Sequence, residues 1–210
     1  MSFTPAIKTR AIGICYLPRL LGFMMSAALV LNSSVTKATD RYWNAASGDW
    51  SDTNPCPWSL GTEPTSSDNA YIQNGGTATI TQEGENCSYL YLGGSKAGTV
   101  DMTDGDLSVV NSLIVGNSGV GTYNLSGTGQ VAALGENIGY LSNGTFIQSG
   151  GTNTVSGTLS LGNSACGTYD LSGMGQLSTD KEYIGLGGVG IFTQSGGINS
   201  ASYVSIGAGS

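Results

Sequence analysis

The chain has 210 residues, of which 39% are apolar and 10% charged, with 34 glycines, 5 prolines and no histidine. This length suits a single domain that can bury a core, and a glycine share about twice the usual one is typical of a turn-rich chain. Without histidine the chain lacks the commonest general base and the commonest metal ligand, so histidine-dependent catalysis is excluded.

Residues 1–38 predict a secretory signal peptide. Basic residues precede the twelve-residue apolar run LLGFMMSAALVL that starts at Leu20, and Thr36 and Ala38 suit a signal-peptidase site. The alternative is an uncleaved membrane anchor, although a spanning helix needs roughly 20 apolar residues. We therefore expect an exported protein, extracellular or on the outer cell surface, with no transmembrane span in the mature chain.

The residues after the signal peptide are strongly acidic. They contain 3 basic and 14 acidic side chains, which gives a net charge of −11. Arg41, Lys96 and Lys181 alone cannot neutralise many phosphates, so nucleic acid is not expected as a partner.

Three cysteines remain after residue 38, an odd number in an export route that permits disulfides. The predicted disulfide joins Cys56 and Cys87, because both flank the non-repetitive N-terminal region. Cys166 is then interpreted as a small buried residue beside a turn rather than as a reactive thiol.

Residues 39–89 predict an N-terminal β cap. They hold all three tryptophans (Trp43, Trp50 and Trp58) and do not fit the repeat that follows. Such a segment can cover the open end of a stack of strands, and NAYIQNGGTATITQ would lead it into the first repeat. The alternative is a tryptophan-lined carbohydrate platform, which requires the aromatic rings to stay exposed.

Residues 90–210 contain five copies of a 23-residue repeat and the start of a sixth. The segments YLGGSKAGTVDMTDG, IVGNSGVGTYNLSGT, NIGYLSNGTFIQSGG, SLGNSACGTYDLSGM and YIGLGGVGIFTQSGG align without gaps from residues 91, 114, 137, 160 and 183. GTYNLSG and GTYDLSG are therefore two steps apart, and alternate copies are more alike. The chain stops soon after the sixth copy begins, so we expect a fragment of a longer protein.

Several columns of this alignment keep one chemical character. The aliphatic column is Leu92, Val115, Ile138, Leu161 and Ile184, and the aromatic-rich column is Val100, Tyr123, Phe146, Tyr169 and Phe192. The two glycine columns are Gly93, Gly116, Gly139, Gly162 and Gly185, and Gly98, Gly121, Gly144, Gly167 and Gly190. The hydroxyl column is Thr103, Ser126, Ser149, Ser172 and Ser195, and the amide column, which starts with a leucine, is Leu107, Gln130, Asn153, Gln176 and Asn199. The first two columns are expected to point inward, and the glycines to form corners. The hydroxyls are expected to bind turn backbone groups, and the amides to form a ladder.

The fold predicted from this repeat is an all-β parallel β-solenoid with 23-residue coils and an N-terminal cap. Each copy holds three short β-prone runs separated by glycine-rich breaks, and stacking the copies pairs like residues about 4.8 Å apart. A propeller built from 46-residue blades is the alternative, but barely two blades are present and a propeller needs at least four.

The quoted cap segment and repeats resemble exported bacterial proteins that carry autotransporter-type and PEP-CTERM-associated repeats. This resemblance covers most of residues 42–207. It implies a right-handed, secreted or cell-surface solenoid with no catalytic residues to carry over.

The segment DMTDGD places Asp101, Asp104 and Asp106 around one turn, where oxygen ligands would suit calcium. It lacks the spacing of known calcium loops, so turn-forming aspartates are the favoured interpretation. Asp180 and Glu182 are the only pair considered for glycoside hydrolysis, and they are interpreted as a solvated acidic edge.

We therefore expect no enzyme, no cofactor and no catalytic residues. The expected function is a structural or adhesive surface module that contacts extracellular polysaccharide or other surface proteins through a repeated face. The alternative is a secreted β-helix protein that binds or cleaves polysaccharide.

Overall fold

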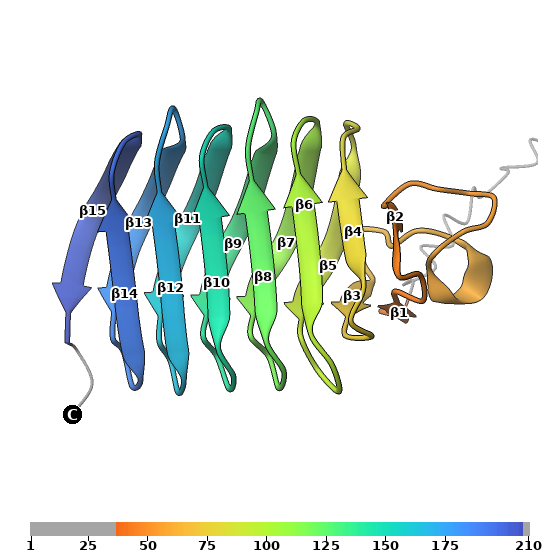
Figure 1. Ribbon diagram of the computed structural model, residues 1–210, viewed down its shortest axis with the longest axis horizontal. Coiled ribbons are helices and arrows are strands. Elements are labelled where there is room, and N and C mark those ends of the chain that lie inside the picture. The colour runs from red at the N-terminus through yellow and green to blue at the C-terminus, as the bar shows by residue number, and fades with distance from the viewer. Residues whose placement is uncertain (1–36, 208–210) are drawn as a thin grey trace, which may run out of the picture. The chain divides into compact units, whose positions relative to one another are not determined.

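A computed structural model describes residues 37–207 as a stack of coils built from two parallel β-sheets. Except for residues 37 and 38, the predicted signal peptide lies outside the described residues. Figure 1 shows the two sheets as two rows of strands that advance together along the stack. The predicted solenoid is thus confirmed, with about 23 residues in each coil.

The first sheet contains strands of up to 10 residues and the second contains strands of at most 6, so we call them the long-strand and the short-strand sheet. The eight strands of the long-strand sheet are β1 (Asp40–Tyr42), β3 (Asn69–Ile72), β5 (Glu85–Leu92), β7 (Asp106–Val115), β9 (Gln130–Ile138), β11 (Thr152–Leu161), β13 (Gln176–Ile184) and β15 (Ile198–Ile206). The seven strands of the short-strand sheet are β2 (Ser47–Asp49), β4 (Thr77–Ile80), β6 (Gly98–Met102), β8 (Gly121–Leu125), β10 (Gly144–Gln148), β12 (Cys166–Leu171) and β14 (Val189–Gln194).

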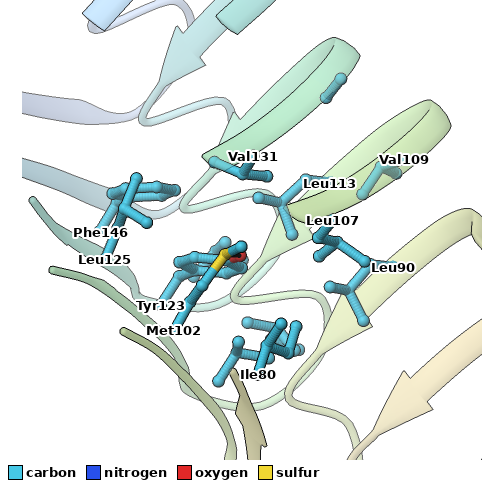
Figure 2. Close-up of a cluster of buried hydrophobic side chains, with 14 of the residues drawn as sticks. Ile80, Leu90, Met102, Leu107, Val109, Leu113, Tyr123, Leu125, Val131 and Phe146 are labelled. Atoms are coloured by element: carbon cyan, nitrogen blue, oxygen red, sulfur yellow. Dashed lines mark hydrogen bonds between the residues drawn. The ribbon is translucent and has the colours of Figure 1, made fainter. Parts of the chain in front are cut away.

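The core lies between the two sheets, as Figure 2 shows for the central coils. Side chains alternate between buried and outward positions along most strands, as the two-residue period of a strand requires. Met102, Tyr123 and Phe146 extend from the short strands toward Leu107 and Leu113 of the long strands. The predicted aliphatic and aromatic columns stack in register, and both are buried up to their fourth members.

Glycine forms the corner after each long strand. The five residues of the column that starts at Gly93 all have positive φ, from 69° to 84°, which only glycine adopts without strain. The column that starts at Gly98 has no such angle. At Gly144 a Cβ atom would collide with the carbonyl oxygen of Val115 and with the backbone of Gly139. The column that starts at Gly93 therefore needs glycine for its backbone conformation, whereas the column that starts at Gly98 needs it because no Cβ fits there.

The coils alternate in shape, which explains why alternate copies are more alike. Turns of three and four residues alternate between the short and long strands, for example 103–105 and 126–129. A compensating change follows at the bend of each strand from β5 to β13 in this sheet, where for example β7 has Val110 and Asn111 but β9 has only Leu134. Each coil from Leu92 to Ile184 therefore still takes 23 residues.

This alternation overturns the predicted amide ladder. The paired positions are Leu107, Val131, Asn153, Leu177 and Asn199, so apolar and amide side chains share one buried column. Gln130 and Gln176 belong to the neighbouring, outward column. The ungapped alignment could not reveal this, because the offset begins at the turn and is cancelled at the bend.

The hydroxyl column behaves as predicted at two positions. Ser126 donates a hydrogen bond to the carbonyl oxygen of Met102 at 3.5 Å, and Ser172 donates one to that of Gln148 at 3.3 Å. Both hydroxyls thereby bind the end of a strand in the preceding coil.

The cap contributes coils of its own. Strands β1–β4 lie within residues 39–89 and pair in register with the strands that follow, so stacking begins earlier than residue 90. A 3-10 turn, η1 (Ser59–Gly61), lies in the loop between β2 and β3.

All three tryptophans are 2% exposed or less and pack edge to face around Trp58. Trp58 also donates its indole hydrogen to the carbonyl oxygen of Trp50 at 2.9 Å. A tryptophan-lined carbohydrate platform is therefore wrong, because the rings form the core of the cap.

The predicted disulfide is not formed in the structure, where Cys56, Cys87 and Cys166 are free thiols. Cys87 points into the core from β5 and is fully buried, in register with Val109. Cys56 lies in the loop after β2 and packs against the tryptophan core of the cap. Cys166 is half-buried at the start of β12, rather than buried as expected.

Candidate functional site

The aspartates considered for calcium bind neighbouring coils instead of one another. Asp101 accepts a hydrogen bond from the Asn124 amide at 2.6 Å, and Asp104 accepts one from the Thr128 hydroxyl at 2.7 Å. Asp106 accepts from the backbone N–H of Gly84 at 3.0 Å. Among residues 37–207 no group of three acidic, cysteine or histidine side chains is placed to hold a metal.

Asp180 and Glu182 lie on opposite faces of β13. Asp180 is exposed at the bend of the strand, whereas Glu182 is 2% exposed and points into the core. Two carboxyls cannot flank one glycosidic bond from opposite faces of a sheet, so this pair does not form a glycosidase site.

A shallow concave surface lies on the outer face of the long-strand sheet, and we call it the outer hollow. It spans β7, β9 and β11 and encloses about 300 Å³ near the bend of these strands. A second depression of about 150 Å³ adjoins it toward the turns and shares Ser108, Ala132 and Thr154 with it.

These shared residues form the floor of the outer hollow, because they occupy one outward column of the sheet. Their short side chains leave the backbone open, whereas the flanking columns carry longer groups. Val110 and Leu134 stand on the side of the bend and are 48% and 55% exposed. The hollow therefore follows from small residues in register between larger ones.

The two sides of the outer hollow differ chemically. The bend side carries Val110 and Leu134 together with Ser156, and the turn side carries Asp106, Gln130 and Thr152. Hydroxyl and amide groups can hydrogen-bond a ligand, while an aliphatic edge packs against its apolar surface. No lysine or arginine lines either depression. The hollow therefore suits an uncharged, hydroxyl-rich ligand better than an anion.

Negative charge gathers at the end of the hollow nearer the cap. Burial, and after it the nearby carboxyls of Glu63, Asp49 and Asp106, together raise the pKa of Glu85 to about 7, although the Glu85 side chain itself points inward in register with Leu107. Asp106 also lines the hollow. This arrangement disfavours polyanions at that end.

A row of tyrosines follows the outer face of the first coils. Tyr42, Tyr71 and Tyr91 stack with ring centroids 5.0 and 4.6 Å apart and interplanar angles of 20° and 6°. Because the rings lie face to face along the stack, the middle ring, Tyr71, is covered on both faces by its neighbours and presents its edge to solvent. The row therefore offers hydroxyls rather than a flat platform for sugar rings.

Two further observations concern other parts of the described chain. The cap encloses a hollow of about 440 Å³ beside Asp52, Pro55 and Cys56. Within residues 37–207 no helix has both the length and the apolar character needed to cross a bilayer.

The outer hollow was not predicted from the sequence. Its floor column is hidden in the ungapped alignment, which sets Gln130 against Leu107 instead of Asp106. The available signal was the difference in turn length, SGTG at residues 126–129 against TDG at 103–105, which shifts the register by one residue.

Comparisons with known proteins do not extend this description: no family model matches the chain, and no match was found among curated proteins or solved structures.

Proposed function

We propose that the chain is an exported, non-enzymatic surface module that acts as a structural or adhesive part and binds a neutral polysaccharide strand in the outer hollow. The observation that carries this proposal is the band of hydroxyl, amide and aliphatic side chains that three coils present in register. Repetition along the stack suits a repetitive polymer, because each coil offers similar groups at the coil spacing of about 4.8 Å.

Charge supports a neutral polymer over an acidic one. Within residues 37–207 the basic side chains are Lys37, Arg41, Lys96 and Lys181, and none of them lines the outer hollow. Export remains part of the proposal and rests on the predicted signal peptide and on the resemblance to exported repeat proteins.

The test is binding of the full chain to a panel of neutral polysaccharides such as dextran, starch and laminarin, with alginate and polygalacturonate as anionic controls. Ala132→Trp should fill the floor of the outer hollow and abolish binding. Ile147→Trp is the matched control, because Ile147 is exposed on the outer face of β10 in the other sheet. Equal loss in both variants, or binding confined to anionic polymers, would overturn the proposal.

The same incubations examine the alternative functions. Release of reducing or unsaturated ends would indicate polysaccharide cleavage. Absence of binding to every polymer, together with retention of the folded state, would favour a scaffold that contacts other surface proteins.

A further inference from the structure

Two pairs of a glutamate and an asparagine lie inside the stack. The amide nitrogen of Asn153 donates to Oε2 of Glu136 at 3.1 Å, and that of Asn199 donates to Oε2 of Glu182 at 3.1 Å. Both glutamates lie in one inward column, at 0% and 2% exposed, and the two pairs are 46 residues apart. The double coil thus repeats a buried polar pair as well as a shape.

Neighbouring hydrogen bonds determine the orientation of Asn153. The amide nitrogen of Gln148 donates to the carbonyl oxygens of Gly151 and Gln176, so its Oε1 accepts the hydroxyl hydrogen of Tyr169 at 2.6 Å. Because Tyr169 has used its only hydrogen, its oxygen accepts one from Nδ2 of Asn153 at 3.1 Å. Nδ2 therefore serves both Tyr169 and Glu136, and Oδ1 of Asn153 is left as an acceptor.

Two buried oxygens of the Glu136 pair have no hydrogen-bond partner in the structure: Oε1 of Glu136 and Oδ1 of Asn153. Two acceptors cannot satisfy each other unless one of them carries a proton. A buried carboxylate oxygen without a donor is also costly, because ionised groups lose more solvation energy on burial than neutral ones.

The Glu182 pair differs in its second donor and in the burial of its asparagine, since Asn199 is half-buried whereas Asn153 is 0% exposed; Oδ1 of Asn199 also lacks a hydrogen-bond partner. The hydroxyl of Thr179 donates to Oε1 of Glu182 at 3.1 Å, so this carboxyl accepts two hydrogen bonds. The position that corresponds to Thr179 in the Glu136 coil is Ala133, through their shared register with Val155. Ala133 has no hydroxyl, so Glu136 lacks the second donor.

No positive charge compensates Glu136 within the described chain. The groups that face it and its partners are the Tyr123 hydroxyl from β8, the Tyr169 hydroxyl from β12, the Cys87 thiol from β5 and the Glu182 carboxyl from β13. Lys96 and Lys181 are exposed, and Arg41 lies 3.6 Å from Asp68. Burial raises the pKa of Glu136 to about 7, although the hydrogen bond from Asn153 acts in the opposite direction.

We propose that Glu136 is a neutral carboxylic acid in the folded protein, that its Oε1–H donates to Oδ1 of Asn153, and that loss of this proton loosens the surrounding coils. Glu136 and Asn153 then hold two reciprocal hydrogen bonds. The second bond gives a partner to both Oε1 of Glu136 and Oδ1 of Asn153, the two atoms that otherwise have none. The coils around β9 and β11 thereby become sensitive to pH, whereas Glu182 has a second donor in Thr179 and a half-buried partner in Asn199.

The direction of the pH effect follows from the two states. The unfolded side chain releases its proton near pH 4.5, whereas the folded one keeps it up to about pH 7. The stability contributed by the neutral acid is therefore complete below pH 4.5 and is lost as the pH rises through 7.

The test is urea unfolding of the full chain from acidic to mildly alkaline pH, for the wild type and Glu136→Gln. Across this window the unfolding equilibrium constant of the wild type should rise up to about 300-fold more than that of the variant. Glu85 titrates in both proteins, so its contribution cancels in the comparison. Parallel pH profiles for the two proteins would overturn the proposal.

Ala133→Thr provides a second test that does not remove the glutamate. Its hydroxyl would donate to Oε1 of Glu136 as Thr179 does for Glu182, so the carboxylate should form at lower pH and the pH dependence should shrink. Infrared difference spectra between the wild type and Glu136→Gln at pH 6 should show a carboxylic acid band that disappears above neutrality, because Glu85 contributes the same band to both proteins and cancels. A difference spectrum at pH 6 that shows only a carboxylate band would indicate an ionised Glu136 and would refute the proposal.

Discussion

The ring of Phe146 stacks on the ring of Tyr123, with 4.8 Å between centroids and 9° between planes. Tyr169 continues the stack on the other side of Phe146 at 4.7 Å and 4°. All three rings are fully buried, and each comes from a different short strand. Their spacing is close to that of neighbouring strands, so the coil period itself brings the rings into contact.

Phe146→Ala should lower the free energy of unfolding by about 3–5 kcal/mol, because it removes a buried ring between two others and leaves a cavity. Urea unfolding monitored by circular dichroism measures the change. Ile147→Ala is the matched control, since the neighbouring Ile147 side chain points outward and is 40% exposed, and it should cost about 0.5 kcal/mol. Equal losses in the two variants would contradict the inward position of the aromatic column.

Gly144→Ala should destabilise the stack by more than about 4 kcal/mol, because the new methyl group would collide with the backbone of the preceding coil. Gly135 provides the control. A Cβ there would be 3.6 Å from the nearest atom, the carbonyl oxygen of Thr158, and its φ is not in the left-handed region. Gly135→Ala should therefore change stability by about 1 kcal/mol or less. Thermal unfolding of both variants distinguishes a close-packed corner from a general intolerance of substitution.

The coil period could be predicted because stacking makes like residues neighbours. Tyr123, Phe146 and Tyr169 satisfy the same contact in successive coils, so the sequence repeats wherever the contact does. The glycine corners are visible for the same reason, since Gly93 and its equivalents share one backbone conformation.

The outer hollow and the buried polar pairs could not be predicted, because both depend on the register after the turn. Compared with the β7 coil, the β9 coil has one more residue in the turn before the strand and one fewer at the bend of the strand. The repeat length is therefore unchanged, and the ungapped alignment does not reveal the shift. Leu107 was consequently aligned with Gln130 rather than with Val131. The charge of Glu182 predicts a solvated side chain, and this prediction is wrong because Glu182 is buried.

Glu63→Gln should lower the pKa of Glu85 from about 7 toward the ordinary value of 4.5, without reaching it, since burial is the largest cause of the increase. The folded state of the wild type holds the Glu85 proton more tightly than the unfolded state. Its contribution to stability is therefore greatest below pH 4.5 and declines as the pH rises through 7.

Carbon-13 NMR titration of the Glu85 carboxyl measures this effect directly. Asp104→Asn serves as the control, because Asp104 is exposed and hydrogen-bonds Thr128 rather than Glu85. An unchanged Glu85 titration in Glu63→Gln would show that Glu63 does not raise the pKa of Glu85.

Cys87→Val should change the free energy of unfolding by about 1 kcal/mol or less, whereas Cys87→Ser should cost about 1–3 kcal/mol. Cys87 is fully buried in a column that continues with Val109, so an apolar side chain of similar size fits there, whereas a hydroxyl would lose its water and lie in the hydrophobic core. Burial also raises the pKa of the Cys87 thiol, so this thiol should resist alkylation in the folded protein and react after unfolding.

Reductant should leave the wild-type unfolding curve unchanged, because Cys56 and Cys87 are both free. If reductant and Cys87→Val each lowered stability by about 3 kcal/mol, the two cysteines would be joined in solution.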